Sequence, residues 1–90
     1  MKEAFFCSLF HQGLLGGGLY VTEDAVIYRT GKLTVSARLR DLTLPLARIQ
    51  EVRWKGLVAT LHLADGETWR FLIFNRPRFA RVLKQALEQR

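Results

Sequence analysis

The residues that could carry chemistry are few and far apart in the sequence. The two histidines, His11 and His62, each stand alone, with no second histidine or cysteine at a spacing that suits a metal ion. The single cysteine, Cys7, lies in an apolar segment without a neighbouring base, which is typical of an inert buried thiol. Asp65 and Glu67 belong to a short turn between two apolar runs. We therefore predict no catalytic residue, no metal ligand and no cofactor, and hence a protein that is not an enzyme.

Basic side chains are the remaining candidates for a binding site. The chain has 14 Lys and Arg against 8 Asp and Glu, a formal net charge of +6, which suits either a solvated surface or an anionic partner. In segment 32–40 polar and apolar residues alternate, so that the basic residues share one face if the segment is extended. The predicted anion- or lipid-binding residues are Arg29, Lys32, Arg38 and Arg40. A second basic group, on or just before a predicted helix, comprises Arg76, Arg78, Arg81 and Lys84.

Length and composition indicate one folded domain over residues 1–90. Hydrophobic residues make up 49% of the chain and charged residues 24%, as in ordinary globular proteins. One cysteine cannot form an internal disulfide, which suits a reducing cytoplasm. The apolar run near the start is too short to span a membrane, and no cleavage pattern follows it. The sequence thus predicts a soluble cytoplasmic protein, with peripheral attachment to a membrane as the alternative.

Most of the chain has the composition of β-strands. Segment 4–11 is apolar enough for a buried strand, and Asp65-Gly66 between two apolar runs is a strong hairpin signal. In segment 32–40 the apolar set is odd-numbered, but from Asp41 onward it is even-numbered, so we expect a bulge or turn there. Pro45 lacks a backbone donor and predicts an edge strand. The predicted strand segments are 4–11, 19–22, 25–29, 32–40, 42–46, 49–54, 57–63 and 68–74, of which 32–40 and 42–46 form one strand if a bulge joins them.

The last segment changes to a helical period. Its apolar residues recur at helical spacing and form one face, so a helix from about residue 75 to 89 should pack on the sheet. Asn75 is the predicted N-cap, and Pro77 suits the first turn. The predicted core face consists of Phe79, Val82, Leu83, Ala86 and Leu87. The fold class predicted from these segments is mainly β, an antiparallel barrel of six to seven strands with one amphipathic C-terminal helix.

Four pieces of sequence, in their order and spacing, resemble the GRAM and bacterial pleckstrin-homology-like families over residues 3–88. The pieces are GGGLYVTEDAVIYR (16–29), LTLPLARIQEV (42–52), the ADGE turn followed by WRF (69–71), and RPRF (76–79). The resemblance implies a strongly bent, partly open, seven-stranded barrel capped at one end by the C-terminal helix. It also implies that Gly16, Gly17 and Gly18 serve a bend and a close backbone approach at the entry to the second strand, rather than a phosphate cradle.

One departure from this resemblance affects the expected ligand. In lipid-binding pleckstrin-homology domains, basic residues in and around the first inter-strand loop hold the phosphates, but segment 11–18 contains no Lys or Arg. Specific phosphoinositide recognition is therefore disfavoured. Leu14 and Leu15 in this segment could insert into a membrane or a protein partner, or pack into the mouth of the barrel.

These observations leave two functions of different kinds. The first is a non-catalytic binding module whose partner is another protein or a second copy of the chain. The second is weak peripheral binding of anionic membrane lipids through the basic face. Nucleic acid is disfavoured, because neither Trp54 nor Trp69 alternates with a strip of basic residues.

Overall fold

The computed structural model describes residues 2–10, 13–31 and 41–90, which form seven strands, a short 3-10 helix and one α-helix. All strand pairs are antiparallel, and the strand order is β4-β3-β2-β1-β7-β6-β5. The elements are β1 (Lys2–Phe10), β2 (Leu14–Thr22), β3 (Ala25–Arg29), β4 (Asp41–Pro45), η1 (Leu46–Arg48), β5 (Ile49–Lys55), β6 (Val58–Leu63), β7 (Thr68–Ile73) and α2 (Arg76–Glu88). Segment 32–40, predicted as a strand, lies outside the described residues.

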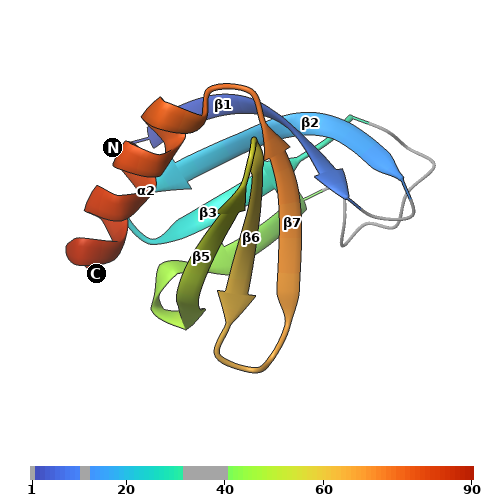
Figure 1. The fold of residues 1–90 in the computed structure, drawn as a ribbon. Helices are drawn as coiled ribbons and strands as arrows, with labels where there is room; N and C mark the ends of the chain where they lie inside the picture. Colours follow the sequence, from blue (N-terminus) through green and yellow to red (C-terminus); the bar gives the residue numbers. More distant parts are fainter. Residues whose placement is uncertain (1, 11–12, 32–40) are drawn as a thin grey trace.

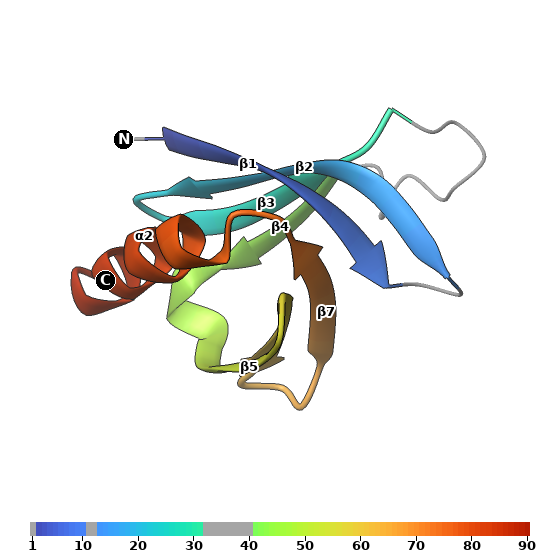
Figure 2. The ribbon, with the colours of Figure 1, turned by 45° about the horizontal axis from the view of Figure 1, so that its top comes forward.

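The sheet folds over on itself as a bent, partly open barrel, which confirms the predicted fold class. Strands β1 to β4 form one half and β5 to β7 the other, and the two halves cross at a steep angle (Figures 1 and 2). Strand β1 joins the halves: it pairs along its whole length with β2 but with β7 only from Cys7 to Leu9. The inward side chains of both halves form one continuous core.

The three glycines lie inside β2, not before it, so the prediction that β2 begins at residue 19 was wrong. Strand β2 begins at Leu14, and Gly16, Gly17 and Gly18 pair with Ser8, Cys7 and Phe6. None of the three has a positive φ, so they do not form a turn. The predicted close approach is confirmed at Gly17, where a Cβ would lie 2.4 Å from the Arg29 carbonyl oxygen.

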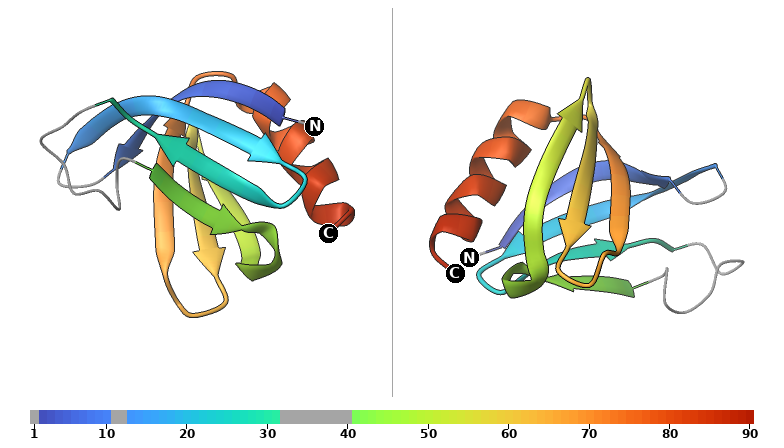
Figure 3. Two further views of the ribbon diagram at one scale, coloured as in Figure 1. Left: turned by 180° about the vertical axis from the view of Figure 1, so that it is seen from behind. Right: turned by 60° about the horizontal axis from the view of Figure 1, so that its bottom comes forward.

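The phenol of Tyr28 explains why Gly17 needs to be a glycine. The Tyr28 ring is buried, and a Cβ on Gly17 would lie 2.8 Å from its Cε1 atom. The Tyr28 hydroxyl donates a hydrogen bond of 2.8 Å to the carbonyl oxygen of Leu15. The ring therefore crosses β2 on its inner side, in the space that a side chain at position 17 would take. The arched course of β1 and β2 over this core is visible from behind in Figure 3.

Two further sequence predictions are confirmed at the edge and at the hairpin. Among the described strands, β4 lies at the edge of the sheet and ends at Pro45, and the even-numbered residues Leu42, Leu44 and Leu46 are buried. The β6–β7 connection turns at Gly66, which has a φ of +86°. An ion pair between Arg48 and Asp65 ties this turn to η1.

Helix α2 packs its predicted face against the open end of the barrel (Figure 3). Phe79, Val82, Leu83 and Ala86 are buried, and Leu87 packs partly buried against the core. The Phe79 ring meets Phe5 edge-on at a centroid distance of 5.1 Å and Trp54 at 5.9 Å. Asn75 occupies the predicted N-cap position, but its side chain makes no cap hydrogen bond; its backbone oxygen accepts from the Phe79 N–H instead.

Candidate functional site

Only one of the four predicted lipid-binding residues can be placed. Arg29 ends β3 on the outer side of the barrel and is exposed. Its Nε atom lies 3.3 Å from Oδ1 of Asp41, its cross-strand neighbour on β4, and its guanidinium carbon lies 6.0 Å from the Tyr20 ring centroid. Lys32, Arg38 and Arg40 lie outside the described residues, so the contiguous basic patch stays a prediction.

Two arginines of the second basic group hold the helix to the barrel. Arg76 donates from Nη1 to the Gly56 carbonyl oxygen at 2.7 Å, and its guanidinium carbon lies 4.9 Å from the Trp54 ring centroid. In such contacts the planar guanidinium group stacks on an aromatic ring, and the aliphatic part of the side chain packs on apolar surface. This side chain is therefore occupied within the fold.

Arg78 is engaged in the same way on the other side of the helix start. Its guanidinium lies over the Phe5 ring, 4.7 Å from the centroid, and its Nη2 is 3.1 Å from Oε1 of Glu3. Arg81 and Lys84 remain exposed on the outer side of α2. The second basic group thus divides into two arginines that position the helix and two side chains that face solvent.

The β1–β2 connection offers no cationic cradle among its described residues. Gly13 has a φ of +118°, and Leu14 and Leu15, which follow it, already belong to β2. Leu15 packs into the barrel, as one of the two predictions had it, whereas Leu14 is 58% exposed. The alternation along the strand separates the two leucines onto opposite faces.

Groups that could do acid–base, nucleophilic or metal chemistry are scattered. Among the described residues, no three His, Cys, Asp or Glu side chains come together as a metal site. Cys7 is buried, and burial raises the pKa of its thiol to about 12. A thiol with so high a pKa has almost no thiolate at neutral pH and is a poor nucleophile.

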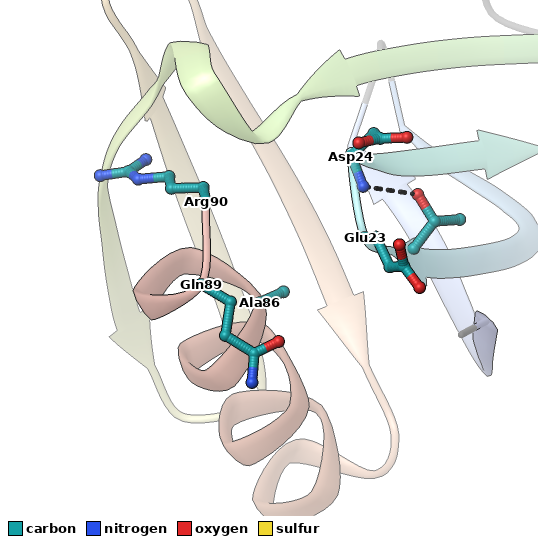
Figure 4. Close-up of a pocket in the computed structure, with 6 residues that line it drawn as sticks. Glu23, Asp24, Ala86, Gln89 and Arg90 are labelled. Carbon is teal, nitrogen blue, oxygen red and sulfur yellow. Dashed lines mark hydrogen bonds between the residues drawn. The ribbon is translucent and has the colours of Figure 1, made fainter.

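A polar hollow of about 420 Å³ lies between the β2–β3 turn and the end of α2 (Figure 4). The turn is rigid, because the Thr22 hydroxyl oxygen accepts from the Asp24 N–H at 3.2 Å and the Ala25 N–H at 3.1 Å. Arg90 points away from Glu23 and Asp24 and donates to the Leu46 carbonyl oxygen at 2.7 Å. The hollow therefore presents carboxylates without a convergent set of ligand-binding groups.

The most unusual surface is apolar. Phe6 in the middle of β1 is 85% exposed, and Phe74, directly after β7, is 60% exposed. The β1–β7 ladder ends at the pair Cys7–Ile73, and Phe6 and Phe74 are the next residues of the two segments beyond that pair. Large exposed side chains that gather in this way on a small domain are typical of interaction sites. We call the outward side of β1, β2 and β7, with Phe74, the outer apolar face; its apolar members are Ala4, Phe6, Phe10, Leu14, Tyr20, Leu72 and Phe74.

The glycines of β2 leave the outer apolar face without side chains at two positions beside β1. Gly18 pairs with Phe6, and Gly16 pairs with Ser8, both on the outward side. A Cβ at Gly16 would meet nothing within 4 Å, so the surface is bare there. Next to Phe6 lies a hollow of about 220 Å³, lined by Ala4, Phe5, Phe6, Gly18 and Tyr20. The outer apolar face thus combines protruding rings with a recess of side-chain size.

Sequence reasoning missed this face because it treated segment 4–11 as a fully buried strand. In the structure only alternate residues of β1, Phe5, Cys7 and Leu9, are buried. A strand with one solvated face ordinarily alternates apolar and polar residues, but here the outward set also contains two phenylalanines, Phe6 and Phe10. The outward set Phe6, Phe10 and Leu14 was the signal that could have shown it.

Comparisons with known proteins identify the fold. No protein-family model matches the chain, and no curated protein matches it in sequence. Similar solved structures include the C-terminal domain of an unknown protein from Leishmania infantum, with a TM-score of 0.73 and 15% identity over 94% of this chain and 82% of that one.

Two further structures carry the comparison. The N-terminal PH domain of human ARAP2 has a TM-score of 0.71 and 12% identity over 97% of this chain and 79% of that one. Inner Membrane Complex Sub-compartment Protein 3 from Toxoplasma gondii has a TM-score of 0.66 and 14% identity over 98% of this chain and 75% of that one. Identities this low show the fold alone. The chain therefore has a pleckstrin-homology-like fold, and membership of the GRAM family stays a prediction.

Proposed function

Starting from this fold, we propose that residues 1–90 form one non-catalytic binding module that binds another protein, or a second copy of itself, through the outer apolar face. The observation that carries the proposal is the exposure of two large rings just beyond one end of the β1–β7 ladder, Phe6 at 85% and Phe74 at 60%, with a recess beside Phe6. The pleckstrin-homology-like fold supports it, because such folds typically serve as binding modules without catalysis. The buried thiol of Cys7 suits a reducing compartment, and we place the module in the cytoplasm.

The free energy gained by covering the two exposed rings is a large part of what a protein interface needs. Covering a phenyl ring stabilises by roughly 1.5–3 kcal/mol, so Phe6 and Phe74 together would contribute about 3–6 kcal/mol. A complex with micromolar affinity needs about 8 kcal/mol. The two exposed rings, with the recess beside Phe6, are therefore sufficient as the centre of an interface, with rim contacts supplying the rest.

The exposed Phe6 ring of the outer apolar face is not needed for the stability of the core. Phe6 contributes little to the core, since most of its side chain is exposed. Replacing it with serine should change the free energy of unfolding by no more than about 0.5 kcal/mol. This separates binding from stability in an experiment.

The test is site-specific photo-crosslinking in cells that produce the protein. A benzophenone side chain at position 6 should form one discrete adduct, with another protein or with the chain itself. The matched control carries the same probe at position 81, on the exposed side of α2, and should form none. An excess of wild type without the probe, produced in the same cells, should abolish the adduct, whereas an excess of Phe6→Ser with Phe74→Ser should not. Equal labelling at both positions would contradict the proposal.

A second candidate function is weak peripheral binding of anionic lipid through Arg29, Lys32, Arg38 and Arg40. The net charge of +6 and the exposure of Arg29 on the outer side of β3 favour it. At about 1 kcal/mol for each basic side chain, four residues supply about 4 kcal/mol, a factor of about a thousand in partitioning. That is too weak to hold a single copy on a membrane, which is why we place this function second.

A further inference from the structure

Among the side chains that the structure describes, the outer apolar face carries a cation, Arg70, whose charge no ion pair compensates. Arg70 on β7 is exposed, and its guanidinium carbon lies 5.7 Å from the Phe10 ring centroid. Four other arginines form ion pairs with Asp or Glu, namely Arg29, Arg48, Arg53 and Arg78. Within the described ranges, no carboxylate pairs with Arg70. A partner that covers Phe10 must therefore desolvate this charge or supply an anion for it.

The register fixes where that anion would be. Ser8 pairs with Leu72, so the same register places Phe10 beside Arg70, as the ring contact confirms. Phe10, the ring that Arg70 contacts, is four positions from Phe6 along β1, and strands rise by about 3.3 Å a residue. The recess beside Phe6 and the Arg70 guanidinium thus lie about 13 Å apart on the outer apolar face.

The charges of the face select the kind of partner. None of the outward positions that the structure describes on β1, β2 and β7 is an Asp or Glu. A second copy would bring the same apolar face, the same arginine and a net charge of +6, and like charges disfavour such a pairing. A mobile lipid headgroup needs no fixed spacing, whereas the recess beside Phe6 has the size of one side chain.

Building on the proposed function, we propose that the partner is a protein segment with both apolar and acidic side chains. It places an apolar side chain in the recess beside Phe6 and a carboxylate on Arg70, about 13 Å further along the face. The apolar contact supplies affinity, and the pairing of Arg70 with a carboxylate fixes the direction in which the segment lies.

The experiment selects the partner chemistry directly. A library of random peptides, long enough to span the face, is displayed and selected on wild type, with peptides that also bind Phe6→Ser with Phe74→Ser removed. The enriched peptides should share an apolar residue and an Asp or Glu at the predicted separation. They should bind Arg70→Glu about tenfold more weakly or worse. Arg81→Glu, which makes the same change of charge on the exposed side of α2, should bind them as wild type does.

A charge swap makes the assignment specific. Exchanging the selected acidic residue of the peptide for Lys should restore binding to Arg70→Glu while weakening binding to wild type. A merely structural effect of the Arg70 substitution would not be rescued in this way.

The remaining outcomes separate the inference from the proposed function. Peptides that require Phe6 but ignore Arg70 would overturn the inference and keep the proposed function. Failure to enrich any peptide over the double variant would overturn both. A dimer that strengthens with salt would identify a second copy as the partner and overturn the inference. Binding to phosphatidylserine vesicles that is lost in Arg70→Gln would also overturn the inference, and would identify a lipid surface as the partner.

Discussion

At the scale of the residue, Gly17 shows how one missing side chain sets the inner wall of the barrel. The Tyr28 ring lies where a Cβ at position 17 would be, 2.8 Å from its Cε1, and the Arg29 carbonyl oxygen would be closer still. Neither the buried ring nor the backbone can move without disturbing the core. The outward Gly16, by contrast, has open space on the side where a Cβ would lie.

The two glycines therefore predict opposite effects. Gly17→Ala should destabilise the protein by roughly 1–3 kcal/mol, as overpacking does. Gly16→Ala should be neutral or stabilise slightly, because it lowers the entropy of the unfolded chain without a clash. The free energies of unfolding from urea titrations measure both changes. Equal values for the two variants would show that β2 does not have the register described.

At the scale of the element, α2 is held from two sides. Its buried face, with Phe79 fully enclosed, closes the end of the barrel. Its first turn is fixed by Arg76 over Trp54 and by Arg78 over Phe5. The helix is thus part of the core. Its helical period in the sequence indicated the buried face but not the contacts of the two arginines. Among the described residues, no helix is long and apolar enough to cross a membrane.

Substitutions on opposite sides of α2 should have very different costs. Leu83 is 2% exposed, so Leu83→Ala should lower the free energy of unfolding by roughly 2–5 kcal/mol. Arg81 faces solvent, and Arg81→Ala should stay within about 0.5 kcal/mol. Chemical denaturation followed by circular dichroism gives both numbers. Similar losses for the two variants would mean that the helix packs on another face.

At the scale of the whole molecule, charge and apolar surface lead to different partners, and vesicles distinguish them. We expect only weak sedimentation of wild type with anionic vesicles at low salt, and none at moderate salt, because screening removes the contribution of exposed charges. Arg38→Glu with Arg40→Glu should reduce the weak binding more than Arg81→Glu with Lys84→Glu, which changes the charge equally. Strong binding that survives salt would favour the membrane over a protein partner.

The sequence by itself determined the elements whose signals are local. The helical period from Phe79 to Leu87 located the buried face of α2, Asp65-Gly66 located the β6–β7 turn, and Pro45 located the end of an edge strand. Each signal depends on backbone geometry within a few residues, namely the period of a helix, a positive φ or a missing N–H donor. Such signals can be read without knowing which strands are neighbours.

Only the tertiary structure decided which apolar side chains are exposed and which arginines contact other residues of the fold. Phe5 and Phe6 are the same residue type in adjacent positions, but Phe5 is buried and Phe6 is 85% exposed. Arg78 and Arg81 look alike on the helix, yet Arg78 lies over Phe5 and Arg81 faces solvent. These outcomes depend on pairing between segments distant in sequence, β1 with β7 and α2 with β1. Packing of non-local neighbours selects the inner face of a strand when both of its faces are apolar, and no local pattern contains that information.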